Sequence, residues 1–171
     1  EYGRLQEKLY RYEGFYVQNR IIRQYAYDVG GNLLGNIREV SPTDIAADEY
    51  YTSGDYTGDL GIEKSYEKML RGEKGVEILL RDAHGRIKGR YENGAYDISP
   101  ISGRNLTLTI DAELQAYGEY LMQNKIGAIV AIEPETGEIL AMVSSPTYKP
   151  SSLIGRERGK NYAALVRDPY K

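Results

Sequence analysis

The sequence predicts an α+β chain: an elongated, sheet-rich domain with short helices, followed by an apolar β-hairpin. Short helical and strand-like patterns alternate along the 171 residues, and none of them is long enough to build one thick core. The aromatic residues point the same way, since there are 17 Tyr, one Phe and no Trp. A Tyr ring packs while its hydroxyl reaches water or a partner, so this composition favours a half-hydrated, extended shape.

The first third of the chain predicts a helix, a strand and a turn. Apolar residues at i, i+4 and i+7 within residues 5–12 predict a short helix. Residues 15–27 are rich in β-branched and aromatic side chains and predict a strand. Gly30-Gly31-Asn32 then signals a turn.

Residues 39–63 carry charge of one sign, and two helices are predicted between Ser41 and Gly72. Ser41 or Thr43 can cap the first helix, and Asp59 can cap the second. The second helix has apolar residues at i, i+4, i+7 and i+8, and Gly72 stands where a left-handed residue ends a helix. The stretch has no base, and we expect its acids to form a solvated surface. The acids are Glu39, Asp44, Asp48, Glu49, Asp55, Asp59 and Glu63.

A hairpin, a strand and a helix are predicted between residues 76 and 121. Residues 76–81 and 86–91 flank a tight-turn sequence and predict the hairpin. Residues 105–110 alternate apolar side chains with Thr and predict a half-buried strand. Asp111 can cap a helix, and its apolar positions are Leu114, Tyr117 and Leu121.

A second hairpin is predicted from residues 127–132 and 138–143. Both arms are nearly continuous apolar runs, a pattern that expects cover on both faces of the sheet. Residues 144–171 are basic and contain one weak helical pattern, around Tyr162, which is too little to provide that cover. We therefore expect the chain to be cut from a longer one, with a poorly covered hairpin at 127–143 that self-associates or is mobile.

The composition excludes several classes of function. Without Cys there is no disulfide, thiolate metal site or catalytic thiol, and with His84 as the single histidine there is no multi-histidine zinc site. The net charge of −3 lacks the basic excess of a nucleic-acid-binding protein. No apolar run approaches the roughly 18 residues of a membrane span.

Ser65 and Lys68 form an S-x-x-K pattern, in which the Lys can activate the Ser of penicilloyl serine transferases. The partner motifs S-x-N and K-T-G do not occur downstream. We therefore expect Ser65 on the hydrated face of its helix rather than in a catalytic site.

Other candidate groups are also expected to be ordinary surface residues. Asp55, Thr57 and Asp59 imitate the start of an EF-hand loop, but Leu60 and Tyr66 replace its essential Gly and Glu. His84 is expected to be exposed in the hairpin turn. Two further sets are expected to be solvated: the turn acids Glu133, Glu135 and Glu138, and the basic tail Lys149, Arg156, Arg158, Lys160, Arg167 and Lys171. The residues thus predict no catalytic, cofactor or metal site.

Several blocks nevertheless resemble class B penicillin-binding proteins, of the penicillin-binding protein 2 type. Residues 61–75 resemble their G-x-E-x-x-Y-x-x-x-L-x-G-x-x-G signature, and residues 106–115 look like their "LTID…LQ" block. Residues 127–146, GAIVAIEPETGEILAMVSSP, are similar to the opening hairpin of their transpeptidase domain. Arg23-Gln24-Tyr25 and residues 168–171 resemble flanking blocks, although Ala26 and residues 148–151 depart from the family pattern.

The resemblance implies that residues 1–105 are the pedestal, or dimerisation, domain and that residues 106–171 begin a transpeptidase domain. The parent enzyme would cross-link peptidoglycan through a serine beyond Lys171, which β-lactams acylate. It would lie at the periplasmic face of the inner membrane, held by an N-terminal anchor outside this sequence. The pedestal would position the catalytic domain and offer surfaces to cell-wall elongation proteins, with no cofactor.

Two alternatives remain open from the residues alone. A stand-alone periplasmic scaffold or binding module would share the Tyr-rich surface and the absence of a site. A hydrolase that uses Glu133 or Glu138 is a more distant alternative. An S-x-x-K helix encoded soon after Lys171 would favour the transpeptidase, and a stop codon would favour the scaffold.

Overall fold

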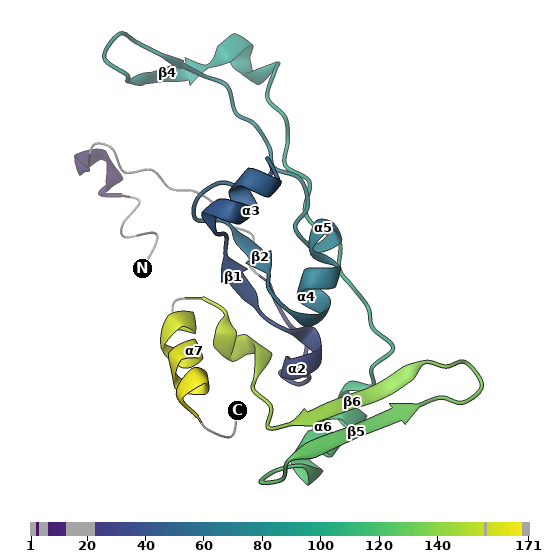
Figure 1. Cartoon of the computed structure of the whole chain (residues 1–171). Coiled ribbons are helices and arrows are strands. Elements are labelled where there is room, and N and C mark those ends of the chain that lie inside the picture. Colours follow the sequence, from purple (N-terminus) through teal and green to yellow (C-terminus); the bar gives the residue numbers. More distant parts are fainter. Residues whose placement is uncertain (1–2, 4–6, 13–22, 156, 169–171) are drawn as a thin grey trace.

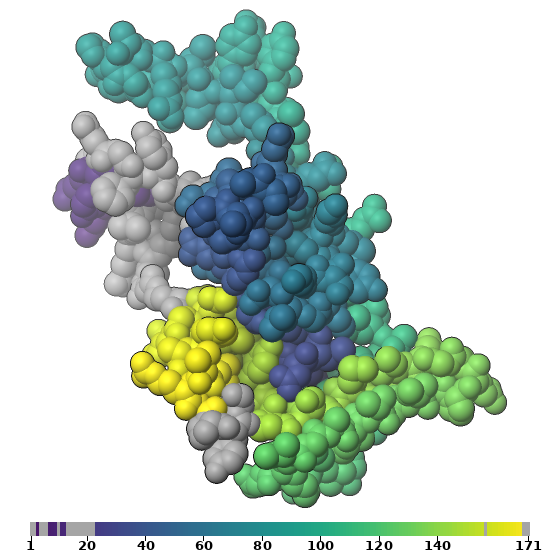
Figure 2. Space-filling view, viewed as in Figure 1, coloured from purple at the N-terminus to yellow at the C-terminus, as the bar shows by residue number. Residues whose placement is uncertain are grey.

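The computed structural model describes residues 3, 7–12, 23–155 and 157–168. These residues have the predicted α+β class and form short helices and three separate two-stranded antiparallel sheets. Figures 1 and 2 show an elongated molecule, with a central body, an arm that leaves it at one end and a hairpin that extends from the other. The predicted extended shape is therefore confirmed.

The body combines one small sheet with short helices. β1 pairs antiparallel with β2, with Ile37 opposite Gly58, and α4 packs on β2. A Cβ on Gly58 would lie 2.2 Å from the Glu63 carbonyl oxygen, so only glycine allows this close approach. The elements are α2 (Gly31–Leu34), β1 (Ile37–Glu39), α3 (Pro42–Ala47), β2 (Tyr56–Gly58), α4 (Gly61–Ser65) and α5 (Glu67–Leu70), preceded by the 3-10 helix η1 (Leu9–Arg11).

The arm is a long two-stranded excursion between Gly72 and Gly103. Two bridges, Glu73 with Ile101 and Val76 with Ile98, join its two sides near the body. Gly72 has the predicted left-handed backbone, with φ of +69°. The predicted hairpin is confirmed in shorter form. Its elements are β3 (Leu79–Arg81), β4 (Ile87–Arg90) and the 3-10 helix η2 (Tyr91–Gly94).

The C-terminal part packs a helix against the second predicted hairpin. α6 (Ala112–Leu121) lies on β6 (Ile139–Ser145), which pairs with β5 (Gly127–Ile132). Val143 and Ala141 are buried on the covered face, whereas Val130 and Ile132 are more than half exposed on the other. This hairpin thus has cover on one face. The short helix η3 (Pro150–Leu153) and α7 (Arg158–Arg167) follow.

The core is thin and unusually polar. In the described chain the buried apolar side chains are Ile37, Val40, Tyr51, Ala141, Val143 and Leu153. Five polar residues are equally buried: Asn36, Thr57, Glu63, Glu67 and Gln115. Each buried side-chain nitrogen or oxygen of the described residues has a hydrogen-bond partner, as a stable interior requires.

Several local predictions are wrong. Residues 105–110 form no strand, because no neighbouring strand pairs with them; the Thr109 hydroxyl and the Asp111 N–H instead reach the carbonyls of Ile139 and Leu140. Gly30-Gly31-Asn32 begins the helix α2 rather than a turn. Residues 23–27 are irregular, and the rest of the predicted 15–27 strand lies outside the described residues, as does part of the predicted 5–12 helix.

The predicted helix caps at Ser41 and Asp111 are confirmed, whereas the one at Asp59 is wrong. Ser41 caps α3 in a reciprocal capping box with Asp44, and the Asp111 side chain caps α6 through the N–H groups of Glu113 and Leu114. Asp59 does not cap α4; its carboxylate pairs with Arg38, and Leu60 takes the cap position. The predicted second helix is also split at Tyr66, whose φ of −110° and ψ of 16° interrupt it.

Candidate functional site

A buried ionic cluster lies at the centre of the body. The Arg23 guanidinium donates to Glu63 and to Glu67, each at 2.8 Å, and to the Leu70 carbonyl at 2.8 Å. The Arg23 side chain is 14% exposed and the two carboxylates less. Burying these charges is tolerable because each is paired and hydrogen-bonded. Arg23 therefore ties the segment before α2 to the helix pair α4–α5.

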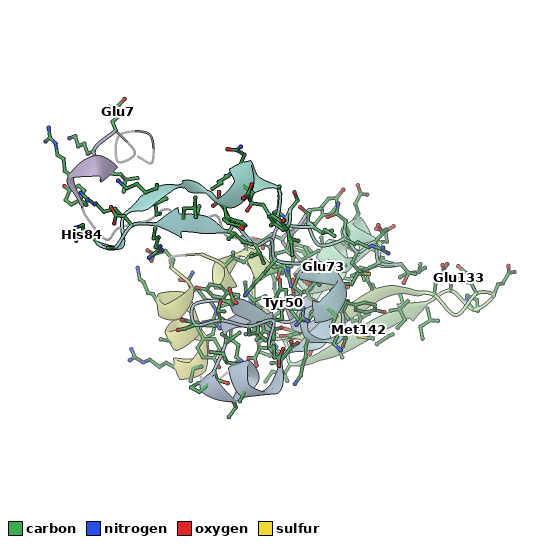
Figure 3. All side chains as sticks on the ribbon, turned by 90° about the horizontal axis from the view of Figure 1, so that it is seen from above. Glu7, Tyr50, Glu73, His84, Glu133 and Met142 are labelled. Carbon is green, nitrogen blue, oxygen red and sulfur yellow. The ribbon has the colours of Figure 1, made fainter. Side chains whose placement is uncertain are left out.

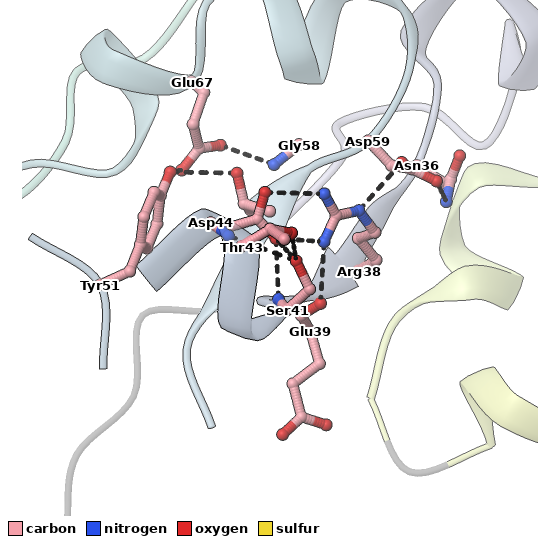
Figure 4. A network of polar contacts seen from close by, with 11 residues as sticks. Asn36, Arg38, Glu39, Ser41, Thr43, Asp44, Tyr51, Gly58, Asp59 and Glu67 are labelled. Carbon is pink, nitrogen blue, oxygen red and sulfur yellow. Dashed lines mark hydrogen bonds and ion pairs between the residues drawn. The ribbon is translucent and has the colours of Figure 1, made fainter. Parts of the chain in front are cut away.

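Tyrosine hydroxyls extend this cluster. Tyr25 donates to Glu63 at 2.9 Å, and burial together with the Glu63 charge raises the pKa of Tyr25 well above its usual value. Tyr51 lies within 3.0 Å of Thr57 and 3.3 Å of Glu67, whose carboxylate also accepts the Gly58 N–H at 3.0 Å. Figure 4 shows Glu67 between the tyrosine and the strand. The cluster is a structural joint, with every polar group occupied by another part of the body.

A second network joins β1 to α3. Arg38 donates to both oxygens of Asp44, at 2.6 and 3.0 Å, and to Asp59 at 3.1 Å (Figure 4). The hydrogen bonds from Arg38, then those from Ser41, hold the pKa of Asp44 far below its usual range. Asp44 therefore stays ionised and acts as a fixed acceptor.

A cavity of about 410 Å³ lies where the arm meets the body. Its walls include Tyr50, Asp55, Arg71 and Lys74. The Arg71 guanidinium lies 4.0 Å from the centre of the Tyr50 ring and donates to Asp48 at 2.7 Å, while Lys74 binds Asp55. Arg71 and Lys74 are thus already paired with carboxylates, so neither is a free cation for an anionic ligand.

The prediction that the acids of residues 39–63 form a solvated surface is wrong. Five of the seven acids in residues 39–63 are ion-paired, with Arg23, Arg38, Arg71 or Lys74 as partners. Arg38 directly precedes this stretch, and Arg23, Arg71 and Lys74 come from other parts of the chain. Asp55, Thr57 and Asp59 also turn to different partners. Among the described residues no three His, Cys, Asp or Glu side chains could hold a metal ion together.

The other candidate residues are dispersed over the molecule. The Ser65 hydroxyl donates to the Gly61 carbonyl at 3.0 Å, on the exposed side predicted for it, and Lys68 is exposed in the next helix. His84 is exposed at the tip of the arm, as predicted, and Figure 3 shows it far from Glu133 at the end of the second hairpin. Glu135 and Glu138 belong to the same hairpin turn as Glu133. The structure thus does not bring these groups together.

Part of the basic tail is helical and contacts β1. Residues 158–167 form α7, and the Arg158 side chain donates to the Ile37 carbonyl at 2.8 Å. Lys160 lies 3.8 Å from Glu157. Arg156 and Lys171 lie outside the described residues.

One exposed surface stands out on the arm. Val76, Ile78 and Leu80 alternate along one side, with Ile98 directly opposite Val76, and each is at least 40% exposed. The other side carries the Arg90–Glu77 ion pair, at 2.7 Å. Apolar patches of this kind mark interaction sites. We refer to Val76, Ile78, Leu80 and Ile98 as the arm patch.

Sequence reasoning missed the residues that build these sites. Arg23 lies within the predicted 15–27 strand, and the pattern of the helix after Asp111 selects apolar positions rather than Gln115. The one available signal is the run of seven acids without a base between them, since such a run attracts bases from elsewhere in the chain.

Comparison with known proteins identifies the family to which this fold belongs. The family model of the penicillin-binding protein dimerisation domain matches residues 1–108. The peptidoglycan D,D-transpeptidase MrdA of Acinetobacter baumannii is 32% identical over 95% of this chain, and that of Salmonella typhimurium is 31% identical over 98%. The chain spans only 24% and 27% of these two relatives.

Solved structures resemble both the dimerisation region and the C-terminal part of this chain. PBP2 of Helicobacter pylori in complex with MreC superposes with a TM-score of 0.76 at 28% identity, over 98% of this chain and 31% of that one. A chain of a peptidoglycan synthase complex gives 0.69 at 26% identity, over 98% of this chain and 31% of that one. The chain is similar to the peptidoglycan D,D-transpeptidase MrdA and to PBP2, and it belongs to the penicillin-binding protein dimerisation domain family.

Proposed function

We propose that this chain is a non-catalytic part of a peptidoglycan D,D-transpeptidase. Residues 1–105 would be the pedestal, and residues 106–171 the start of the transpeptidase domain. The observation that carries this is the match to MrdA over 95% of the chain but 24% of the relative, which includes α6 and the β5–β6 hairpin beyond the family model. The dispersed positions of Ser65, His84 and the turn acids support a structural role.

The chain alone should neither transpeptidate nor bind β-lactams covalently. The test is incubation with a fluorescent penicillin, followed by denaturing electrophoresis. A full-length relative should give a fluorescent band, whereas this chain should give none. A band that survives denaturation and disappears in Ser65→Ala would contradict the proposal.

The arm patch is the surface that we assign to a protein of the cell-wall elongation machinery. PBP2 of Helicobacter pylori is found in complex with MreC, and we propose an MreC-like partner here. The patch suits a protein partner because its exposed side chains are apolar. On the opposite side of the arm, Arg90 and Glu77 neutralise each other as an ion pair. The parent would place it at the periplasmic face of the inner membrane.

Binding of the chain to the MreC of the same organism tests this assignment. Leu80→Asp puts an unpaired charge into the apolar contact and should lower affinity at least about tenfold. Arg81→Ala, on the opposite side of the same strand, is the matched control and should bind like the parent chain. Equal affinities for all three would contradict the assignment.

No helix among the described residues is both long and apolar enough to cross a bilayer. We propose that the parent is held at the membrane by a segment outside this sequence.

We also propose that the open face of the β5–β6 hairpin, around Val130 and Ile132, drives self-association of the isolated chain. A monomer at all concentrations in analytical ultracentrifugation would contradict this.

A further inference from the structure

The tripeptide Gly30-Gly31-Asn32 docks directly onto the C-terminal part of the chain. The Gly30 N–H donates to Glu119 of α6 at 2.6 Å. The Asn32 amide donates to the carbonyls of Ser144 at 3.0 Å and Pro146 at 2.9 Å. A Cβ on Gly31 would lie 2.1 Å from the Tyr148 carbonyl oxygen, so no side chain fits at that position.

Gln115 completes the contact from inside α6. It is 1% exposed, and its amide nitrogen donates to Glu119 and to the Met142 carbonyl, each at 3.0 Å. Its amide oxygen accepts the Met142 N–H at 2.8 Å. Both donors and the acceptor are therefore used, and the amide pairs with the edge of β6 as a neighbouring strand would.

The chemistry requires an amide at this position. A carboxylate could not donate to Met142 and would lie against Glu119, and an apolar side chain would leave the Met142 N–H and carbonyl without partners. The same Glu119 oxygen accepts from Gly30 and from Gln115. Gly30 of the dimerisation region and Gln115, which binds Met142 of the hairpin, thus share one carboxylate oxygen.

We propose that Gly30-Gly31-Asn32 and the pair Gln115–Glu119 form an interdomain latch. Gln115 is its positioning residue, and the latch holds the dimerisation region and the β5–β6 hairpin in one fixed orientation. A force or a partner that moves the dimerisation region then moves β6 with it. This goes beyond the proposed function, because the latch is a property of the chain whether or not its parent is a transpeptidase.

Residue-resolved amide hydrogen exchange on the 171-residue chain tests the latch. Gly31→Ala adds one methyl group against Tyr148 and should separate the two surfaces, so the Gly30 and Met142 amides exchange at least about tenfold faster. The Gly58 amide, bonded to Glu67 in the body, should keep its rate. Gly159→Ala is the matched control, since a Cβ there meets nothing within 4 Å in α7.

A second pair of variants separates the latch from general stability. Glu119→Gln keeps an acceptor oxygen and should retain the protection of Gly30, whereas Glu119→Ala should lose it by about tenfold or more. Equal acceleration of Gly30, Met142 and Gly58 in Gly31→Ala would overturn the proposal, because it reports global unfolding. Unchanged Gly30 and Met142 in both Gly31→Ala and Glu119→Ala would overturn it as well.

Discussion

The body and the arm use the same kinds of ion pair in opposite environments. In the body, Arg23 joins Glu63 and Glu67, 40 and 44 residues away, with all three side chains largely buried. In the arm, Arg90 pairs with Glu77 while 61% of its own side chain is exposed. Breaking a buried pair strands a charge, whereas water replaces the partner of an exposed one. The body is therefore held together by its charges, and the arm keeps its apolar side free for contact.

The largest effect is expected from Glu67→Ala. The substitution removes one of the two carboxylates that bind the buried Arg23, which keeps Glu63, and leaves the Gly58 N–H without its acceptor. A hydrogen bond to a charged group contributes about 1.5–3 kcal/mol and an unsatisfied buried N–H costs about 1–3 kcal/mol, so the free energy of unfolding in urea should fall by about 3–5 kcal/mol. A loss below about 1 kcal/mol would show that the cluster does not hold the body.

A smaller effect is expected from Asp111→Ala. The Asp111 carboxylate accepts from the N–H groups of Glu113 and Leu114 at the start of α6. Removing such a cap costs about 1 kcal/mol, which should appear as a lower midpoint in urea. Asp111→Asn, which keeps a capping oxygen, should recover most of the loss; failure to do so would contradict the capping role.

Acidic pH should weaken the joint between β1 and α3. Arg38 and Ser41 lower the pKa of Asp44, and Arg71 and the Tyr50 N–H lower that of Asp48. Because both folded pKa values are depressed, their stabilisation is complete above the unfolded value of about 3.9 and is lost as the pH falls below it.

Asp44→Asn should therefore flatten the fall in stability between about pH 4 and pH 2. Glu135→Gln, in the exposed hairpin turn, serves as the control for removing one carboxylate. Identical pH profiles for Asp44→Asn and the parent chain would contradict the role of the Arg38 network.

The smallest effect is expected from Arg90→Ala in the arm. Arg90 pairs with the half-exposed Glu77 at 2.7 Å and more weakly with Asp97 at 3.7 Å. Because the Arg90 side chain is itself 61% exposed, such pairs are worth about 0–1 kcal/mol. The urea midpoint should barely move. A loss as large as that of Glu67→Ala would erase the difference between arm and body.

Local chemistry explains what the sequence could predict. The caps at Ser41 and Asp111, the left-handed Gly72 and both hairpins depend on residues within a few positions of one another, and all are present. The strand predicted at 105–110 failed because strands depend on a neighbour. The same applies to residues 23–27, which bind the body through Arg23 and Tyr25 side chains instead of a ladder.

The buried face of α6 shows the limit of periodicity. Apolar spacing selects Leu114, Tyr117 and Leu121, yet all three are more than a third exposed. The buried positions are Gln115 and Gly118, because Gln115 binds the edge of β6 and a Cβ on Gly118 would lie 2.7 Å from Val143. Only the position of β6, about 25 residues later in the chain, decides which face is covered.

A pair of double-mutant cycles tests the central claim most directly, namely that buried charges hold the body and exposed ones do not hold the arm. The cycles compare Arg23 with Glu67 and Arg90 with Glu77 by urea unfolding. We predict a coupling free energy of at least about 2 kcal/mol for the buried pair and below about 1 kcal/mol for the arm pair. Equal coupling energies for the two pairs would contradict the account.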